Sequence, residues 1–171
     1  LSDPTPVTPE FTETNLWYTV SKEQTISLSD DYHNYDLIRF EFWNRSGQYS
    51  WDVVTTPSSL DKILSFGEGV CFNEFNNNQY WYGTYDDTTY TFSRVGDRNT
   101  YFSKVVGLVC NNFTMTEDVI YSAPARSSSN VTISTVKNLY NYYALMVVAN
   151  GAYDEVQPCY LSIDPHIDDR L

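Results

Sequence analysis

The chain has 171 residues, of which 22 are acidic and 10 are basic, so its formal net charge is −12. Leu, Ile, Val and Phe make up about a quarter of it, above the roughly 20% below which highly charged chains stay disordered, and the length fits one domain. The negative charge disfavours a phosphate backbone and anionic lipid, and no apolar run reaches the roughly 18–20 residues of a membrane span. We therefore expect a folded protein that neither binds nucleic acid nor inserts into a membrane.

The first 14 residues differ in composition from the rest. Pro4, Pro6 and Pro9 alternate with threonine and acidic residues, which favours extended, polyproline-like backbone. Residues 1–14 are therefore interpreted as a lead-in, either a linker or a tail, and residues 15–171 as a single β-rich domain.

From Leu16 onward the apolar pattern has a period of two, as in half-buried strands. Ile38, Phe40 and Phe42 alternate with Arg39 and Glu41. Further strand-like runs are Trp51–Thr55, Val70–Phe75, Gln79–Thr84, Thr88–Val95, Tyr101–Val109, Asp118–Tyr121, Asn130–Ser134, Tyr143–Ala149 and Tyr160–Ile163. The pattern predicts an all-β fold, an antiparallel β-sandwich or jelly roll with at most one or two short helices.

One segment has helical spacing. Between Pro57 and Leu64, the apolar residues Leu60, Ile63 and Leu64 share one side, and a serine is the expected N-cap.

One hairpin can be predicted in detail. Asp86-Asp87 would be a two-residue loop that sets Trp81 opposite Phe92 in the core and leaves Tyr80 and Tyr82 on a wetter face. There is also a weak internal echo, because 25–35 and 132–142 share Thr-Ile-Ser and Asn-Tyr at the same spacing before an apolar strand. A strand–loop–strand unit used twice accounts for it.

No arrangement of residues points to catalysis or to a metal. The only imidazoles are His33 in a polar loop and His166 in an acidic tail, and adjacent aspartates on turns usually face water. Glu68 and Glu74 lie near strand ends, but nothing in the sequence brings them together as a hydrolytic pair. We expect no catalytic residue, no bound metal and no cofactor.

The cysteines leave the redox state open. Cys71, Cys110 and Cys159 lie far apart without a CxxC pair, so either one disulfide with one thiol or three thiols fits the count.

Surface recognition is the function that the composition favours. Aromatic rings stack on the apolar faces of sugars, while amides and carboxylates bind hydroxyls, and the same side chains also suit protein-binding loops. The stretch 76–87 is the richest in such groups. The candidate binding residues are Asn77, Asn78, Tyr80, Tyr82, Tyr85, Asp86 and Asp87.

Four short segments form a recognisable pattern, namely Leu16-Trp17, 25–29 (TISLS), 34–38 (NYDLI) and 104–107 (KVVG). Through them, residues 16–109 resemble the distal tail-fibre and receptor-binding domains of bacteriophages. These residues are structural, so the resemblance assigns no receptor contact. Such fibre domains are commonly trimers, which makes a homo-oligomer one expectation, although no heptad seam marks it.

A fainter resemblance, to the glycan-binding head of rotavirus spikes, rests on size, the Pro/Thr-rich start and the Tyr, Asn and Thr content. Both resemblances imply a non-enzymatic attachment domain on a virion surface. It would bind a host cell-surface glycan or glycoprotein and contact other virion proteins through its N-terminal segment. The alternatives are a carbohydrate-binding or adhesion module of a cellular surface protein and, less favoured, a glycan hydrolase.

Overall fold

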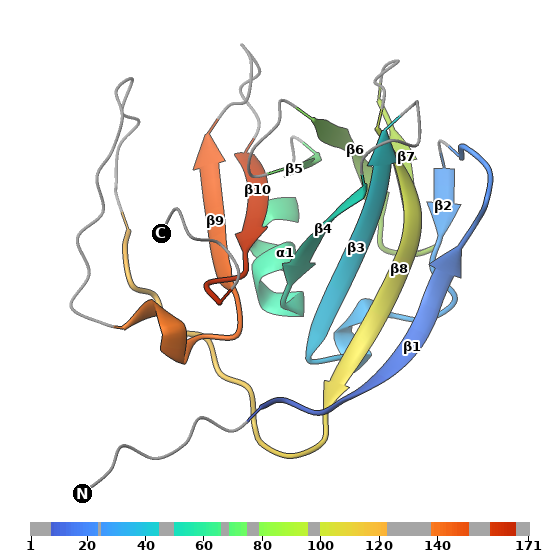
Figure 1. Ribbon diagram of the computed structural model, residues 1–171. Coiled ribbons are helices and arrows are strands. Elements are labelled where there is room, and N and C mark those ends of the chain that lie inside the picture. The colour runs from blue at the N-terminus through green and yellow to red at the C-terminus, as the bar shows by residue number, and fades with distance from the viewer. Residues whose placement is uncertain are drawn as a thin grey trace, which may run out of the picture.

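The computed structural model describes residues 8–23, 25–44, 50–65, 69–74, 79–95, 100–122, 138–150 and 158–166. Within these ranges ten strands form two sheets, with one α-helix and two 3-10 helices between them (Figure 1). The predicted all-β sandwich is confirmed.

The four-stranded sheet has the order β1 (Phe11–Tyr18), β8 (Thr100–Cys110), β3 (Leu37–Asn44) and β4 (Ser50–Thr55), and its neighbouring strands are antiparallel. The predicted alternation in β3 is confirmed, since Ile38, Phe40 and Phe42 are fully buried.

The six-stranded sheet has the order β2 (Thr25–Ser27), β7 (Thr91–Arg94), β6 (Tyr80–Asp86), β5 (Val70–Asn73), β10 (Pro158–Ile163) and β9 (Leu145–Asn150). Its pairs are antiparallel except β5 with β10, which is parallel. That parallel pair makes Cys71 and Cys159 register partners, whereas Cys110 ends β8 in the other sheet.

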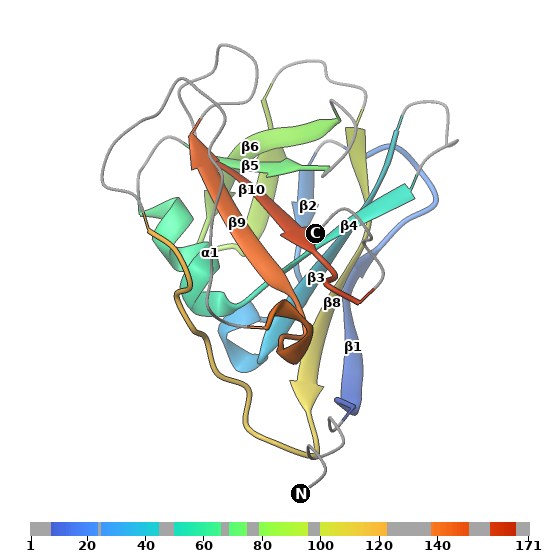
Figure 2. The ribbon, with the colours of Figure 1, turned by 60° about the vertical axis from the view of Figure 1, so that its left-hand side comes forward.

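Hydrogen bonds join the two sheets along both sides of the sandwich. On one side β10 lies beside β4 (Figure 2), where the Tyr160 hydroxyl donates to the Val54 carbonyl (2.9 Å) and the Val54 N–H donates to Ser162 Oγ (2.8 Å). On the other side the Ser29 N–H donates to the Leu16 carbonyl of β1 (2.9 Å). These bonds satisfy backbone groups that would otherwise be unpaired at a strand edge.

Aromatic rings from both sheets fill the core. Phe40 and Phe102 of one sheet contact Phe72 and Trp81 of the other, with ring centroids 4.6 Å apart for Phe40–Phe72 and for Trp81–Phe102. Trp81 and Phe92 are both fully buried, so the prediction that they belong to the core is confirmed.

The predicted helix is confirmed as α1 (Pro57–Leu64), with Leu60 and Ile63 buried. Its N-cap is Thr56, whose Oγ1 accepts from the Ser59 N–H (3.2 Å), so the expected serine cap is wrong. Threonine caps in the same way because its hydroxyl oxygen reaches the same backbone donor.

The predicted register of the β6–β7 hairpin is wrong by four residues. Phe92 pairs with Tyr85 instead of Trp81, and residues 87–90 form the connection. The longer loop forms because the Asp86 carboxylate accepts from the Thr88 N–H (2.9 Å) and Tyr90 adopts a positive φ of 53°. An even shift keeps each side chain on its predicted face, which is why Trp81 and Phe92 are still both in the core.

The expected lead-in and one expected strand need correction. β1 begins at Phe11, inside the segment interpreted as a lead-in, because its backbone pairs with β8 even though residues 12–15 are exposed. Residues 118–121 form no strand, since Val119 and Tyr121 are exposed and their backbone has no strand partner. Residues 1–7 and the expected strand 130–134 lie outside the described residues.

The internal echo corresponds to two similar turns. Each is a 3-10 helix, η1 (Tyr32–Asn34) or η2 (Leu139–Asn141), that begins at an Asx N-cap and is followed by a tyrosine. The next strand is β3 or β9 respectively. The first half of the second unit, 132–134, lies outside the described residues.

Candidate functional site

The residues around η1 form a polar turn at one end of the sandwich, between β2 and β3. Asp31 caps η1 through its side chain, which accepts from the His33 N–H (3.0 Å). Tyr32 is buried, whereas His33 is exposed to solvent. The turn therefore combines one buried side chain with exposed polar ones.

Two contacts hold this turn on the four-stranded sheet, and a third lies within the turn. The Tyr35 ring lies against Gly107 of β8, where a β-carbon would come within 2.4 Å of the ring. The Tyr35 hydroxyl donates to Asp30 Oδ2 (3.0 Å), and Asp36 Oδ2 accepts from the Cys110 N–H (2.8 Å). The Asn-Tyr-Asp and Lys-Val-Val-Gly motifs of the sequence thus contact each other, and their role here is to position η1.

A histidine between two aspartates connects η1 to α1. His33 Nδ1 lies 2.6 Å from Asp31 Oδ1, and His33 Nε2 lies 2.8 Å from Asp61 Oδ2. Partial burial alone would lower the pKa of His33, but the hydrogen bonds to Asp61 and Asp31 outweigh it and raise that pKa above 6.5. The backbone N–H of His33 lowers the pKa of Asp31.

Tyr32 adds a further donor to this group. Its hydroxyl donates to Asp61 Oδ1, and its ring stacks on the His33 ring at a centroid distance of 4.2 Å. Burial and the bond to the Asp61 carboxylate raise the pKa of Tyr32, so the phenol stays a neutral donor. Asp61 is thus held by two side chains of η1, although it is distant from η1 in the sequence.

The β6–β7 turn places Tyr85 and its neighbours beside η1. The Tyr85 ring packs against Tyr32 at 5.6 Å and against Phe92 at 4.5 Å. Burial raises the pKa of Tyr85, and the nearby charges of Asp31 and Asp87 raise it further. The Tyr90 carbonyl accepts from the Leu28 N–H (2.9 Å), which attaches the turn to the segment before η1.

These three segments together define one surface, which we name the acidic–aromatic surface. It consists of Asp30, Asp31, His33, Asp61, Tyr85, Asp86, Asp87 and Tyr90. It contains five carboxylates and one imidazole, beside the two partly exposed tyrosine rings. Since η1 and α1 are fixed by the bonds above, the surface is largely pre-formed.

The predicted binding residues do not form one surface. Tyr85, Asp86 and Asp87 lie on the acidic–aromatic surface, but Tyr80 is only 9% exposed and clusters with Cys71 and Tyr82 on the outer face of the six-stranded sheet. The expectation that Tyr80 is exposed is therefore wrong, because Cys71 and Tyr82 cover it.

Asn77 and Asn78 lie outside the described residues, as does Glu68. Glu74, half-buried, follows β5 and is not part of the acidic–aromatic surface.

The sequence did not identify Asp31, His33 and Asp61 as a group. The sequence predicts that adjacent aspartates are solvated turn residues and that His33 is a loop residue. The local signal was the Asp-Tyr-His-Asn run, which is typical of an Asx-capped turn. Asp61 had no such signal, because only the packing of α1 brings it to η1.

The chemistry of this group favours binding over proton transfer. Both ring nitrogens of His33 face carboxylates, so the imidazolium form is stabilised and neither nitrogen is directed at a nucleophile. The imidazole lies between the carboxylates, so the three groups do not converge on a common point. Within the described ranges, no cluster of three or more His, Cys, Asp and Glu side chains is suited to hold a metal ion.

Searches of protein-family models, curated proteins and solved structures each gave no significant match to this chain. In the part of the chain that the structure describes, no helix has the length and apolar character needed to span a membrane.

Proposed function

We propose that this chain is a non-enzymatic attachment domain that binds a host cell-surface glycan through its acidic–aromatic surface. The observation that carries the proposal is the convergence of η1, α1 and the β6–β7 turn. It puts oriented carboxylates next to tyrosine rings at one end of a rigid sandwich. Carboxylates accept hydrogen bonds from sugar hydroxyls, and a ring stacks on a pyranose.

The charge of the surface supports a particular class of glycan. With five carboxylates and one imidazole, it repels the carboxylate of a sialic acid and attracts the hydroxyl donors of neutral sugars. Neutral oligosaccharides are therefore the proposed ligands, and sialylated or sulfated ones are disfavoured.

A virion location is supported by the resemblance of residues 16–109 to phage receptor-binding domains. A cellular adhesion module would use the same surface. The sequence upstream of Leu1 distinguishes these sources, since a fibre repeat favours a virion and an appended enzyme or wall anchor favours a cellular protein.

The test is a glycan array that contains matched neutral and sialylated oligosaccharides. We expect neutral glycans to bind, and Asp87→Asn to weaken binding by about tenfold, because one charge-assisted hydrogen bond is worth about 1.5 kcal/mol. Asp118→Asn is the matched control. It removes the same charge from the segment after β8 and should leave binding unchanged.

Three outcomes would count against the proposal. The first is an array without signal combined with tight binding to a protein receptor. The second is equal loss of binding in Asp87→Asn and Asp118→Asn. The third is turnover of a bound glycan, which would favour a hydrolase.

A further inference from the structure

His33 connects two elements that are distant from each other in the chain. η1 follows β2, whereas α1 follows β4. The His33 ring lies between the Asp31 carboxylate of η1 and the Asp61 carboxylate of α1, at 2.6 and 2.8 Å. Both carboxylates belong to the acidic–aromatic surface, so the ring bridges two parts of that surface.

The number of protons on the ring decides how many of these contacts are favourable. A protonated imidazole donates from both nitrogens and satisfies both carboxylates. A neutral imidazole has one N–H, so the lone pair of its other nitrogen faces a carboxylate oxygen at hydrogen-bond distance. Loss of a single proton therefore converts an attractive contact into a repulsive one.

Among the described residues, the other groups found around the ring do not replace the lost proton. On η1 the neighbours are Asp31 and the stacked Tyr32 ring, and on α1 the neighbour is Asp61. From the β6–β7 hairpin, Tyr85 lies near Asp31 and Asp61, and Asp87 lies near Tyr85. The charged groups among these are carboxylates.

We propose that His33 is a proton-dependent positioning residue, which clamps Asp31 and Asp61 in the arrangement that the glycan contacts and releases them when it loses its proton. This inference rests on the proposed function for its ligand. The clamp itself is a property of the chain without ligand.

The direction of the pH dependence follows from the titrating groups. The two carboxylates raise the pKa of His33 above 6.5 in the folded protein, against the opposing effect of partial burial. The part of the clamp that depends on the ring proton is therefore fully present below 6.5 and is lost as the pH rises through the raised pKa. On the acid side it is lost when Asp31, whose pKa is lowered by the His33 backbone N–H, takes up a proton.

The first experiment uses the chain without ligand. Imidazole NMR follows His33 from pH 5 to 10, with His166 as internal comparison, and hydrogen exchange reports on residues 30–36 and 57–64. We expect amide exchange, corrected for its intrinsic pH dependence, to be roughly tenfold faster in both segments above the His33 transition. Loss of the proton without any change in exchange would overturn the clamp.

The second experiment measures binding on an array of neutral oligosaccharides at pH 6 and pH 9 with three variants. His33→Arg keeps a charge that donates to two carboxylates, so it should bind at both pH values. His33→Gln should bind weakly at both, and His166→Gln should behave as the wild type. A wild type that binds equally at both pH values while His33 deprotonates would overturn the inference.

Failure of the clamp and failure of the proposed function give different results. If no neutral glycan binds at any pH, the proposed function fails, and the exchange experiment alone then decides whether the clamp exists.

Discussion

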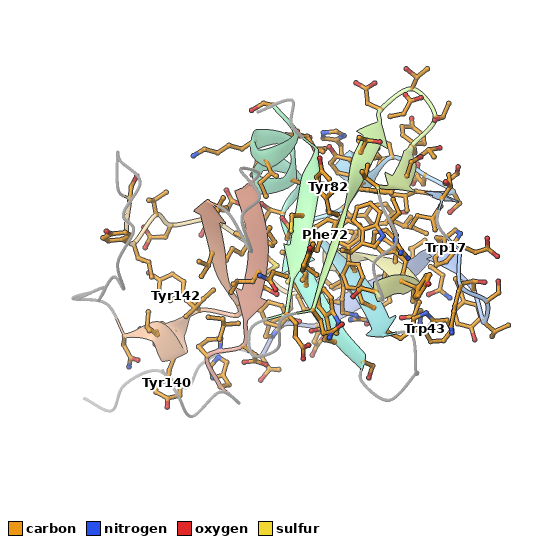
Figure 3. The ribbon with its side chains drawn as sticks, turned by 90° about the horizontal axis from the view of Figure 1, so that it is seen from above. Trp17, Trp43, Phe72, Tyr82, Tyr140 and Tyr142 are labelled. Atoms are coloured by element: carbon orange, nitrogen blue, oxygen red, sulfur yellow. The ribbon has the colours of Figure 1, made fainter. Side chains whose placement is uncertain are left out.

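The two turns η1 and η2 begin alike and end in different environments. In each, an Asx side chain accepts from the backbone N–H two residues on, and the N–H of the following tyrosine donates to the first helical carbonyl. η1 buries Tyr32 and rests on β8 through Tyr35, whereas η2 buries none of its residues and Tyr140 is 63% exposed. Figure 3 shows Tyr140 and Tyr142 beside β9, on the opposite side of the molecule from Trp17 and Trp43.

The difference shows that the local sequence sets the turn and that packing decides its rigidity. The tyrosine after η2 donates from its hydroxyl to Asp118 (2.7 Å), and its carbonyl lies 3.0 Å from His166 Nε2. Asp118 and His166 are exposed, so these bonds compete with water. The bonds of η1 are reinforced by a buried ring and by a glycine that admits Tyr35.

The largest expected effect on stability comes from filling the space that Gly107 leaves next to the Tyr35 ring. In Gly107→Ala the new β-carbon would lie 2.4–2.6 Å from three atoms of the Tyr35 ring, so the ring must move and η1 moves with it. We expect a loss of about 1–3 kcal/mol in the free energy of unfolding, which is typical of overpacking, measured by chemical denaturation. Val109→Ala, at an exposed position on the same strand, is the control and should change little. Equal stability of the two variants would contradict this account of η1.

How much of the fold and of the candidate site can be predicted from the sequence depends on how far apart the interacting residues are in the chain. The β-sandwich, the core faces of β3 and β6, and the bounds of α1 were predictable, because alternation and helical spacing are local signals. The hairpin register was not, since it depends on the positive φ of Tyr90. The parallel β5–β10 pair and the contact between Asp61 and His33 were not, because both join segments that are distant in the chain.

The next prediction concerns Asp61, which anchors η1 through both Tyr32 and His33. Asp61→Asn keeps an oxygen that accepts from Tyr32 but removes the charge that holds protonated His33. Because both side chains are 47% exposed, we expect a loss of only about 0.5–1 kcal/mol at pH 6. The folded pKa of His33 is raised, so this loss should disappear as the pH rises through it. Denaturation of both proteins from pH 5 to 10 checks this, and a difference that grows with pH would contradict it.

Exchanging the N-cap residues of η1 and η2, Asp31 and Asn138, separates the contribution of helix capping to stability from that of the carboxylate charge. Asn and Asp cap helices about equally well, so Asn138→Asp should change the stability by less than about 0.3 kcal/mol. Asp31→Asn keeps the cap but removes the carboxylate charge that contacts His33 Nδ1. We therefore expect it to lower the free energy of unfolding by about 0.5 kcal/mol more than Asn138→Asp does. Denaturation at pH 6 measures both. If the two variants behave alike, Asp31 acts as a cap alone.

The last comparison concerns the hydroxyls of the two tyrosines that follow the turns, Tyr35 and Tyr142. Tyr35→Phe removes a donor to the partly buried Asp30 (3.0 Å), whereas Tyr142→Phe removes a donor to the exposed Asp118 (2.7 Å). We expect Tyr35→Phe to lower the free energy of unfolding by about 1 kcal/mol and Tyr142→Phe to lower it by less than about 0.5 kcal/mol. The longer bond contributes more because its site is more buried, whereas water replaces the partner of the exposed bond. Hydrogen exchange of residues 30–36 and 138–144 in the two variants provides the comparison. Tyr142→Phe should leave both segments nearly unchanged, and Tyr35→Phe should speed exchange in 30–36 alone. The reverse order would mean that donor–acceptor distance, and not burial, sets the difference between η1 and η2.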